Sequence, residues 1–131
     1  MLDHVGLKVS DFARSRAFYE RALAPLDVAL VMEVTPEQSG GGEHVGFGND
    51  RKPWFWIGTD GAAHGGTHVA IATPSRANVD AFHAAAIAAG GRDNGPPGLR
   101  PHYHAHYYGA FILDPDGHNI EAVCHAPGSN A

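Results

Sequence analysis

Three histidines stand at alternate positions in RPHYHAHYYGAF, residues 100–111. If this segment is a strand, His102, His104 and His106 point to one face, while Tyr103 and Tyr107 face away. Imidazoles can bind a divalent metal, or serve as general acid or base beside one. The alternative is an irregular, exposed segment, because glycines and prolines precede it. We expect His104, and next His102, to line a substrate pocket rather than to form an independent metal site.

A second candidate set is spread over the whole chain. His4 and His68 open two short runs, DHVGLKV and THVAIA, in which aliphatic residues alternate with others, and Glu121 lies in a third, HNIEAV. If the aliphatic side chains pack under a helix, all three residues share the opposite, open face. Two imidazoles and one carboxylate suit Fe, Mn, Ni, Zn or Co, and three protein ligands leave positions for a substrate. The alternative for each residue is an ordinary hydrogen-bonded side chain on a half-exposed strand.

The chain repeats itself at a shift of 64 residues, and this repeat supplies the elements that position the set. Residues 3–23 align without a gap on residues 67–87, so that His4 falls on His68. A strand opens each half and an amphipathic helix follows it. Ser10 or Asp11 can cap the first helix and Ser75 the second. The expected buried stripes are Ser15, Phe18, Tyr19, Ala22 and Leu23 in the first helix, and Val79, Phe82, His83, Ala86 and Ile87 in the second.

Three further strands complete each half. In the first half we expect them near 28–34, 44–47 and 54–57. In the second half, HYYGAFIL turns at DPDG, residues 114–117, into HNIEAV. The segment before these strands, residues 92–103, is rich in turn residues and is expected to be mostly loop. The result is a single α+β domain over residues 1–131, with module one at about 1–64 and module two at about 65–131.

Composition narrows the classes of partner. The net charge is −5 with the ten histidines neutral, and no basic patch favours nucleic acid. No apolar run reaches membrane-spanning length and no signal peptide is evident, so we expect no membrane association. The single cysteine, Cys124, allows no internal disulfide, which favours the cytoplasm, and we expect it to be a small core or edge residue. His118 and His125 are expected at the surface.

The motifs DHVGLKVSD, THVAIA and DPDGHNIEAV resemble those of the vicinal oxygen chelate superfamily, over residues 2–124. That group contains glyoxalase I, extradiol dioxygenases, methylmalonyl-CoA epimerase, fosfomycin-resistance enzymes and bleomycin-binding proteins. The resemblance implies two tandem βαβββ modules that form a cupped, eight-stranded mixed β-sheet, with helices on the outer face and the site in the cup. It also implies that His4, His68 and Glu121 are the metal ligands, in agreement with the set chosen above.

The sequence departs from the family's pattern at a fourth position. The equivalent of Glu121 in module one is Ile57 in a gapless alignment, or Trp56 after a slip of one residue. Neither can bind a metal, whereas glyoxalase I members usually carry a glutamate there. Trp54 and Trp56 share one strand face and could line a pocket for a flat substrate, although one of the aromatic pairs in PWFWIG could belong to the core.

Two functions from different classes follow. The first is a metal-dependent lyase, isomerase or dioxygenase that acts on a small oxygenated substrate, and not an ordinary four-ligand glyoxalase I. The second is a metal-free small-molecule binding protein of the bleomycin-resistance type. The catalytic residues stay unassigned in either case. We expect a homodimer, with the site either within one chain or shared between two.

Overall fold

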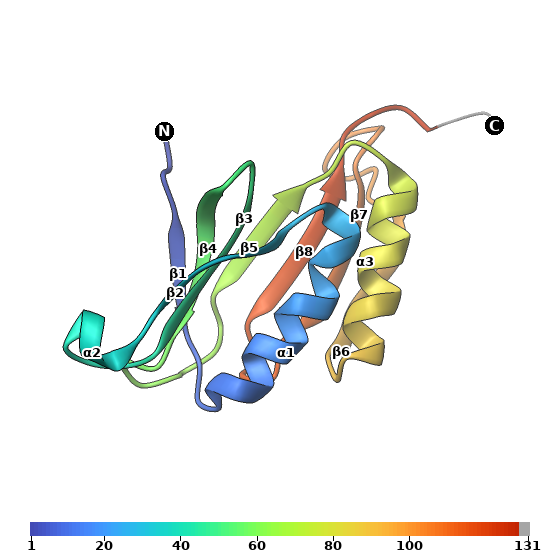
Figure 1. Cartoon of the computed structure of the whole chain (residues 1–131). Helices are drawn as coiled ribbons and strands as arrows, with labels where there is room; N and C mark the ends of the chain where they lie inside the picture. The colour runs from blue at the N-terminus through green and yellow to red at the C-terminus, as the bar shows by residue number, and fades with distance from the viewer. Residues whose placement is uncertain (129–131) are drawn as a thin grey trace.

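The computed structural model describes residues 1–128, which form two similar halves (Figure 1). The first half contains β1 (Val5–Lys8), α1 (Phe12–Ala22), the 3-10 turn η1 (Ala24–Leu26), β2 (Ala29–Val34), α2 (Pro36–Ser39), β3 (His44–Asn49) and β4 (Lys52–Gly58). The second half contains β5 (His68–Ala72), α3 (Arg76–Ala88), β6 (Arg92–Leu99), β7 (Tyr108–Leu113) and β8 (Asn119–Cys124).

The eight strands form two four-stranded mixed sheets, in the orders β1-β4-β3-β2 and β5-β8-β7-β6. The opening strand of each half pairs in parallel with the last strand of that half, and the other pairs are antiparallel. The α+β class and the doubled βαβββ order are therefore confirmed. Both opening strands, β1 and β5, lie at the edges of their sheets.

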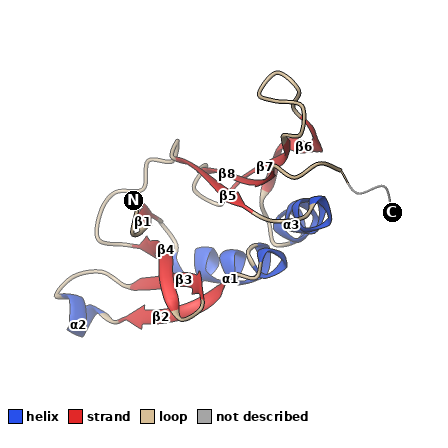
Figure 2. Cartoon of the chain, turned by 90° about the horizontal axis from the view of Figure 1, so that it is seen from above, coloured by secondary structure: helices blue, strands red, loops and turns tan. Residues whose placement is uncertain are grey.

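The two long helices begin at predicted caps. The Asp11 carboxylate accepts the N–H of Arg14 at 3.1 Å, and the Ser75 hydroxyl accepts the N–H of Asn78 at 3.1 Å. Helices α1 and α3 lie side by side, and the two sheets extend away from this pair of helices on different sides (Figure 2). The stripe of α1 is buried as predicted. The buried stripe of α3 is narrower than predicted, because Ile87 is 39% exposed.

Residues 92–99 form strand β6, whereas the sequence indicated mostly loop. The strand is irregular, with register shifts on either side of Gly95. Pro96 and Pro97 have no N–H to donate to a neighbouring strand. The strand tolerates them because β6 is the edge strand of its sheet and pairs only with β7.

The core of module one is an aromatic cluster between α1 and its sheet. The Tyr19 ring lies 5.0 Å from that of Phe55 and 4.9 Å from that of Phe18, and all three residues are at most 1% exposed. Cys124, at the end of β8, is buried in the same connected core, as predicted.

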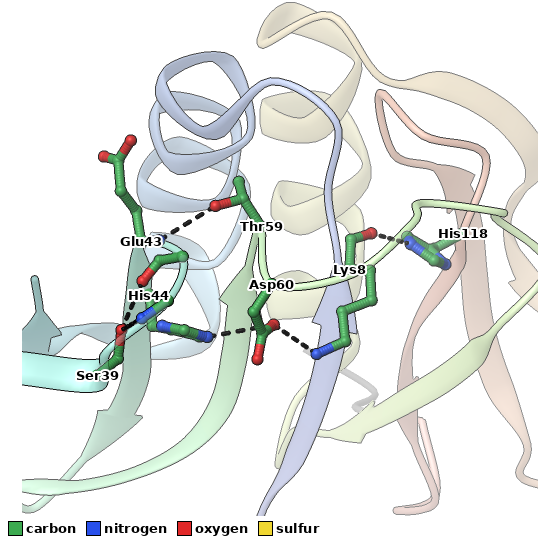
Figure 3. A network of polar contacts seen from close by, with 9 residues as sticks. Lys8, Ser39, Glu43, His44, Thr59, Asp60 and His118 are labelled. Atoms are coloured by element: carbon green, nitrogen blue, oxygen red, sulfur yellow. Dashed lines mark hydrogen bonds and ion pairs between the residues drawn. The ribbon is translucent and has the colours of Figure 1, made fainter. Parts of the chain in front are cut away.

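Buried polar contacts tie the two modules together. The Tyr19 hydroxyl of α1 donates to Asp114 of the second module at 2.5 Å. The other oxygen of Asp114 accepts the backbone N–H groups of Asp116 and His118, which closes the turn before β8. Nε2 of His118 donates to the Lys8 carbonyl at 2.9 Å (Figure 3). His118 is only 3% exposed, so the prediction of a surface histidine was wrong. Its ring fills the junction between modules.

We predict that Tyr19→Phe lowers the free energy of unfolding by about 1–3 kcal/mol, because a buried carboxylate loses a hydrogen bond. Tyr108→Phe is the matched control, since the Tyr108 hydroxyl donates to Asp80 at an exposed site. Urea unfolding of both variants measures the difference. Equal, small losses would contradict a structural role for the buried contact with Asp114.

Candidate active site

His68 and Glu121 meet on the open face of the second sheet. The parallel register of β5 and β8 places His68 opposite Asn119 and Ala70 opposite Glu121. Nε2 of His68 then lies 3.2 Å from Oε1 of Glu121, which is only 1% exposed. Nδ1 of His68 lies 3.0 Å from the Asn119 carbonyl oxygen. Because that oxygen accepts, Nδ1 carries the proton, and a neutral ring turns the lone pair of Nε2 toward the carboxylate. Two acceptors that face each other in this way require a proton or a metal cation between them.

Tyr107 holds the second oxygen of the same carboxylate. Its hydroxyl donates to Oε2 of Glu121. Desolvation and this hydrogen bond raise the pKa of Tyr107, so the phenol stays a donor at neutral pH. Gly109 makes room for the contact, because a Cβ there would lie 3.1 Å from Oε2 of Glu121 and 3.3 Å from the Tyr107 ring. The Phe111 ring stacks on His68 with centroids 6.1 Å apart, which further fixes the imidazole.

His4 lies apart from this pair. The Lys8 end of β1 touches His118, the residue before β8, and His68 pairs with the first residue of β8. The His68 end of β5 is therefore near Lys8. His4 lies at the other end of β1, roughly 13 Å from Lys8 at about 3.3 Å per residue. His4 hydrogen-bonds Asp3 at 2.7 Å and lines a different hollow with residues 69–72. Within residues 1–128, no three His, Cys, Asp or Glu side chains are grouped to hold a metal ion.

Strand register identifies the fourth position. Val5 of β1 pairs with Phe55, and its equivalent in the repeat, Val69, pairs with Ile120. The next pair in each ladder joins Gly6 to Trp56 and Ala70 to Glu121. Trp56 is thus the structural equivalent of Glu121, which selects the one-residue slip over the gapless alignment.

The two tryptophans lie on the open face of the first sheet, and both are half-buried. Trp54 lines the hollow that contains His4, which has a volume of about 330 Å³. Trp56 covers the backbone of Gly46, where a Cβ would come within 2.8 Å of the indole. Neither lies in the hollow beside His68 and Glu121.

The histidine-rich segment forms turns rather than a strand. The Arg100 N–H donates to the Tyr107 carbonyl at 2.7 Å, which closes a loop between β6 and β7. This loop lines a hollow of about 500 Å³ over the His68–Glu121 pair. The residues around the hollow are His68, His102, Tyr103, His104, Tyr107, Phe111, Glu121 and His125. His102 and His104 therefore border this hollow, and their role in a substrate pocket stays a prediction.

Two residues of this hollow lie differently from the strand-based expectation. Strand alternation turned Tyr103 and Tyr107 away from the histidines, but alternation does not hold in a loop. His125 is exposed, as predicted, and it also borders the hollow through its contact with His104. Cross-strand pairing is the signal that could have identified Tyr107. This residue directly precedes β7, and β7 pairs with β8, the strand that carries Glu121.

Comparison with known proteins places this geometry in a family. The sequence profile of the Glyoxalase/Bleomycin resistance protein/Dioxygenase superfamily matches residues 1–122. The chain belongs to that superfamily. A crystal structure of a superfamily member from Albidiferax ferrireducens T118 is 30% identical, with a TM-score of 0.79 over 96% of this chain and 99% of that one. A search of the curated proteins returned no match.

More distant superfamily structures share the fold. The fosfomycin resistance protein FosX from Listeria monocytogenes, complexed with Mn(II) and 1S,2S-dihydroxypropylphosphonic acid, is 18% identical with a TM-score of 0.69, over 96% of this chain and 93% of that one. Glyoxalase I from Zea mays is 19% identical with a TM-score of 0.67, over 98% of this chain. This chain spans 45% of that longer maize chain. No helix in the described part of the chain could cross a membrane.

We predict that Tyr107→Phe, measured in chelator, lowers the free energy of unfolding by about 1.5–3 kcal/mol, because the buried Glu121 carboxylate loses a hydrogen bond. Tyr103→Phe serves as the control, since Tyr103 is 57% exposed. Urea unfolding followed by circular dichroism gives both values. A loss no greater than that of the control would mean that Tyr107 does not hold Glu121.

Proposed function

We propose that this chain is a metal-dependent enzyme, a lyase, isomerase or dioxygenase, acting on a small substrate that offers two adjacent oxygens. The proposed ligands are His68 and Glu121 of one chain and His4 of a second copy. One observation carries the proposal: the buried Glu121 carboxylate faces the lone-pair nitrogen of His68 at 3.2 Å. The proposed compartment is the cytoplasm, in keeping with the single, buried cysteine.

The donor set fits a divalent transition metal. Imidazole nitrogen and carboxylate oxygen are ligands shared by Fe(II), Mn, Ni, Zn and Co. The bond from Nδ1 of His68 to the Asn119 carbonyl is of the kind that orients metal-binding histidines. A divalent ion bound there would act as a Lewis acid toward two adjacent substrate oxygens.

The chain's own residues prepare this face for a substrate. Tyr107 occupies one carboxylate oxygen of Glu121 and leaves the other toward His68. Phe111 holds the imidazole plane by stacking. The adjoining hollow, about 500 Å³, is of the size that small-molecule sites have, and aromatic rings line much of it.

A second copy is proposed because one chain keeps its two histidines apart. The contact between His118 and Lys8 anchors the far end of β1 beside β5 and leaves His4 roughly a strand length from His68. Both opening strands are edge strands within their sheets, so each has a free side for pairing. In a twofold dimer, His4 of each chain would approach the His68–Glu121 pair of the other chain.

A structural neighbour supports the proposal of a bound metal, and the residue at the fourth ligand position limits the type of reaction. The FosX complex contains Mn(II) and 1S,2S-dihydroxypropylphosphonic acid. Trp56 stands where a fourth ligand would lie, so we do not propose ordinary four-ligand glyoxalase I chemistry.

The alternative is a metal-free binding protein of the bleomycin-resistance type. Trp56 at the fourth position favours this reading, as do the half-exposed aromatic side chains of both open faces. In this case a proton would occupy the gap between His68 and Glu121, and the hollow would bind a small, partly aromatic ligand.

We predict that untagged protein reloaded with Mn, Fe(II), Co, Ni or Zn retains about one ion per chain for at least one of these metals. Glu121→Gln should abolish retention while the protein stays folded, because the amide keeps the volume but loses the charge. Glu37→Gln, at the exposed start of α2, is the control and should retain metal. Elemental analysis after gel filtration is the measurement. Metal-free wild type under all five conditions would favour the binding protein.

Mixed dimers test whether the site is shared. Homodimers of His4→Ala and homodimers of Glu121→Gln should each fail to bind metal. A heterodimer of the two would contain one doubly damaged site and one intact site, so it should regain half of the wild-type metal content. Two different histidine-free tags allow the heterodimer to be purified for elemental analysis.

No metal in this heterodimer, together with full binding in wild type, would place all ligands in one chain. The control heterodimer carries Glu121→Gln in both chains and His4→Ala in only one, and it should bind nothing under either arrangement.

A further inference from the structure

A pair of histidines outside the proposed ligand set borders the same hollow. Nε2 of His104 lies 2.9 Å from Nδ1 of His125, and the two rings stack with centroids 5.2 Å apart. His104 comes from the loop before β7, and His125 directly follows β8. Both side chains are exposed to solvent and both line the hollow.

Backbone geometry fixes the direction of this hydrogen bond. The N–H of His106 donates to Nδ1 of His104 at 3.0 Å, so this nitrogen is an acceptor. In neutral His104 the proton therefore lies on Nε2, which donates to Nδ1 of His125. Neutral His125 then carries its own proton on Nε2. That N–H makes no hydrogen bond within residues 1–128 and is the free donor of the pair.

The pair lies one aromatic ring away from the proposed metal ligands. The Tyr107 ring packs edge-on against His104 and His125, with centroids 5.5 and 5.3 Å away, and its hydroxyl reaches Glu121. Tyr103 packs against Tyr107 at 4.8 Å. A molecule that extends from the metal position along the hollow would therefore pass aromatic rings before it reaches the histidine pair.

A positive charge lies beside the His68 end of the hollow, because Phe111 stacks on His68. The Arg100 guanidinium stacks over the Phe111 ring at 5.5 Å, and Phe111 lines the hollow. At the opposite end, a fixed N–H donor beside flat aromatic walls suits a planar, unsaturated molecule that ends in a carboxylate.

We propose that His125, oriented by His104, is a specificity-determining residue that donates from Nε2 to the carboxylate of a flat, unsaturated substrate. His104 is its positioning residue. The inference rests on the proposed function only for the chemistry at the other end of the substrate, beside His68 and Glu121. The carboxylate contact itself needs no metal, because its donor is a ring N–H held by protein groups alone.

Benzoate binding to metal-free protein in excess chelator tests this assignment by isothermal titration calorimetry. Against wild type, His125→Phe keeps a ring but removes the donor, and its dissociation constant for benzoate should rise at least tenfold. His104→Phe should produce a smaller rise, because the donor remains but loses its orientation. His64→Gln removes an exposed linker histidine and should bind benzoate as wild type does.

Ring-nitrogen NMR provides a second measurement that needs no variant. Benzoate should shift the Nε2 resonance of His125 and leave that of His64 in place. Equal affinity in wild type and His125→Phe, absence of benzoate binding in wild type, or an unmoved His125 resonance would overturn the proposal. Because metal is absent throughout, failure of the metal site affects none of these results. Conversely, Glu121→Gln can lose metal and still bind benzoate through His125.

Discussion

The buried Asp114 carboxylate sets how the two halves of this protein meet. One oxygen closes the turn before β8 through two backbone N–H groups, and the other accepts the Tyr19 hydroxyl from the first module. A carboxylate that is 2% exposed is costly unless it is fully hydrogen-bonded, so the turn and the helix must keep these positions. The same turn presents His118 to the Lys8 carbonyl. The relative placement of the two opening strands, and hence of their histidines, depends on this junction.

Local features of the fold could be predicted from the sequence. The shift of 64 residues located both modules, and helical periodicity found the buried faces of α1 and α3. The approach failed where residues far apart in the chain act on each other. His118 looked like a turn residue at the surface because nothing in DPDGH indicates that Lys8 lies opposite. β6 looked like loop because its prolines are compatible with a strand only at a sheet edge, and edge position is a property of the assembled sheet.

The candidate site was predicted in part for the same reason. His68 and Glu121 belong to one module, and alternation along paired strands was sufficient to bring them to one face. His4 belongs to the other module, so its distance from them depends on the junction rather than on any strand pattern. The contact of Tyr107 with Glu121 could not be predicted, because Tyr107 lies at the end of a loop. The shape of that loop depends on hydrogen bonds such as the one from the Arg100 N–H to the Tyr107 carbonyl, which no sequence pattern indicates.

Repetition with divergence explains the asymmetry between the two halves. Equivalent positions carry His4 and His68, but Trp56 and Glu121 differ completely in chemistry. The second module keeps a carboxylate held by Tyr107 beside its histidine, whereas the first keeps an indole over Gly46.

A crystal structure grown with Zn(II), with an anomalous map at the zinc edge, tests the central claim most directly. The account predicts a peak about 2.0–2.2 Å from Nε2 of His68 and from a carboxylate oxygen of Glu121, with His4 of a second copy as the third protein ligand. A peak at the His104–His125 pair alone, or no peak beside Glu121, would contradict it.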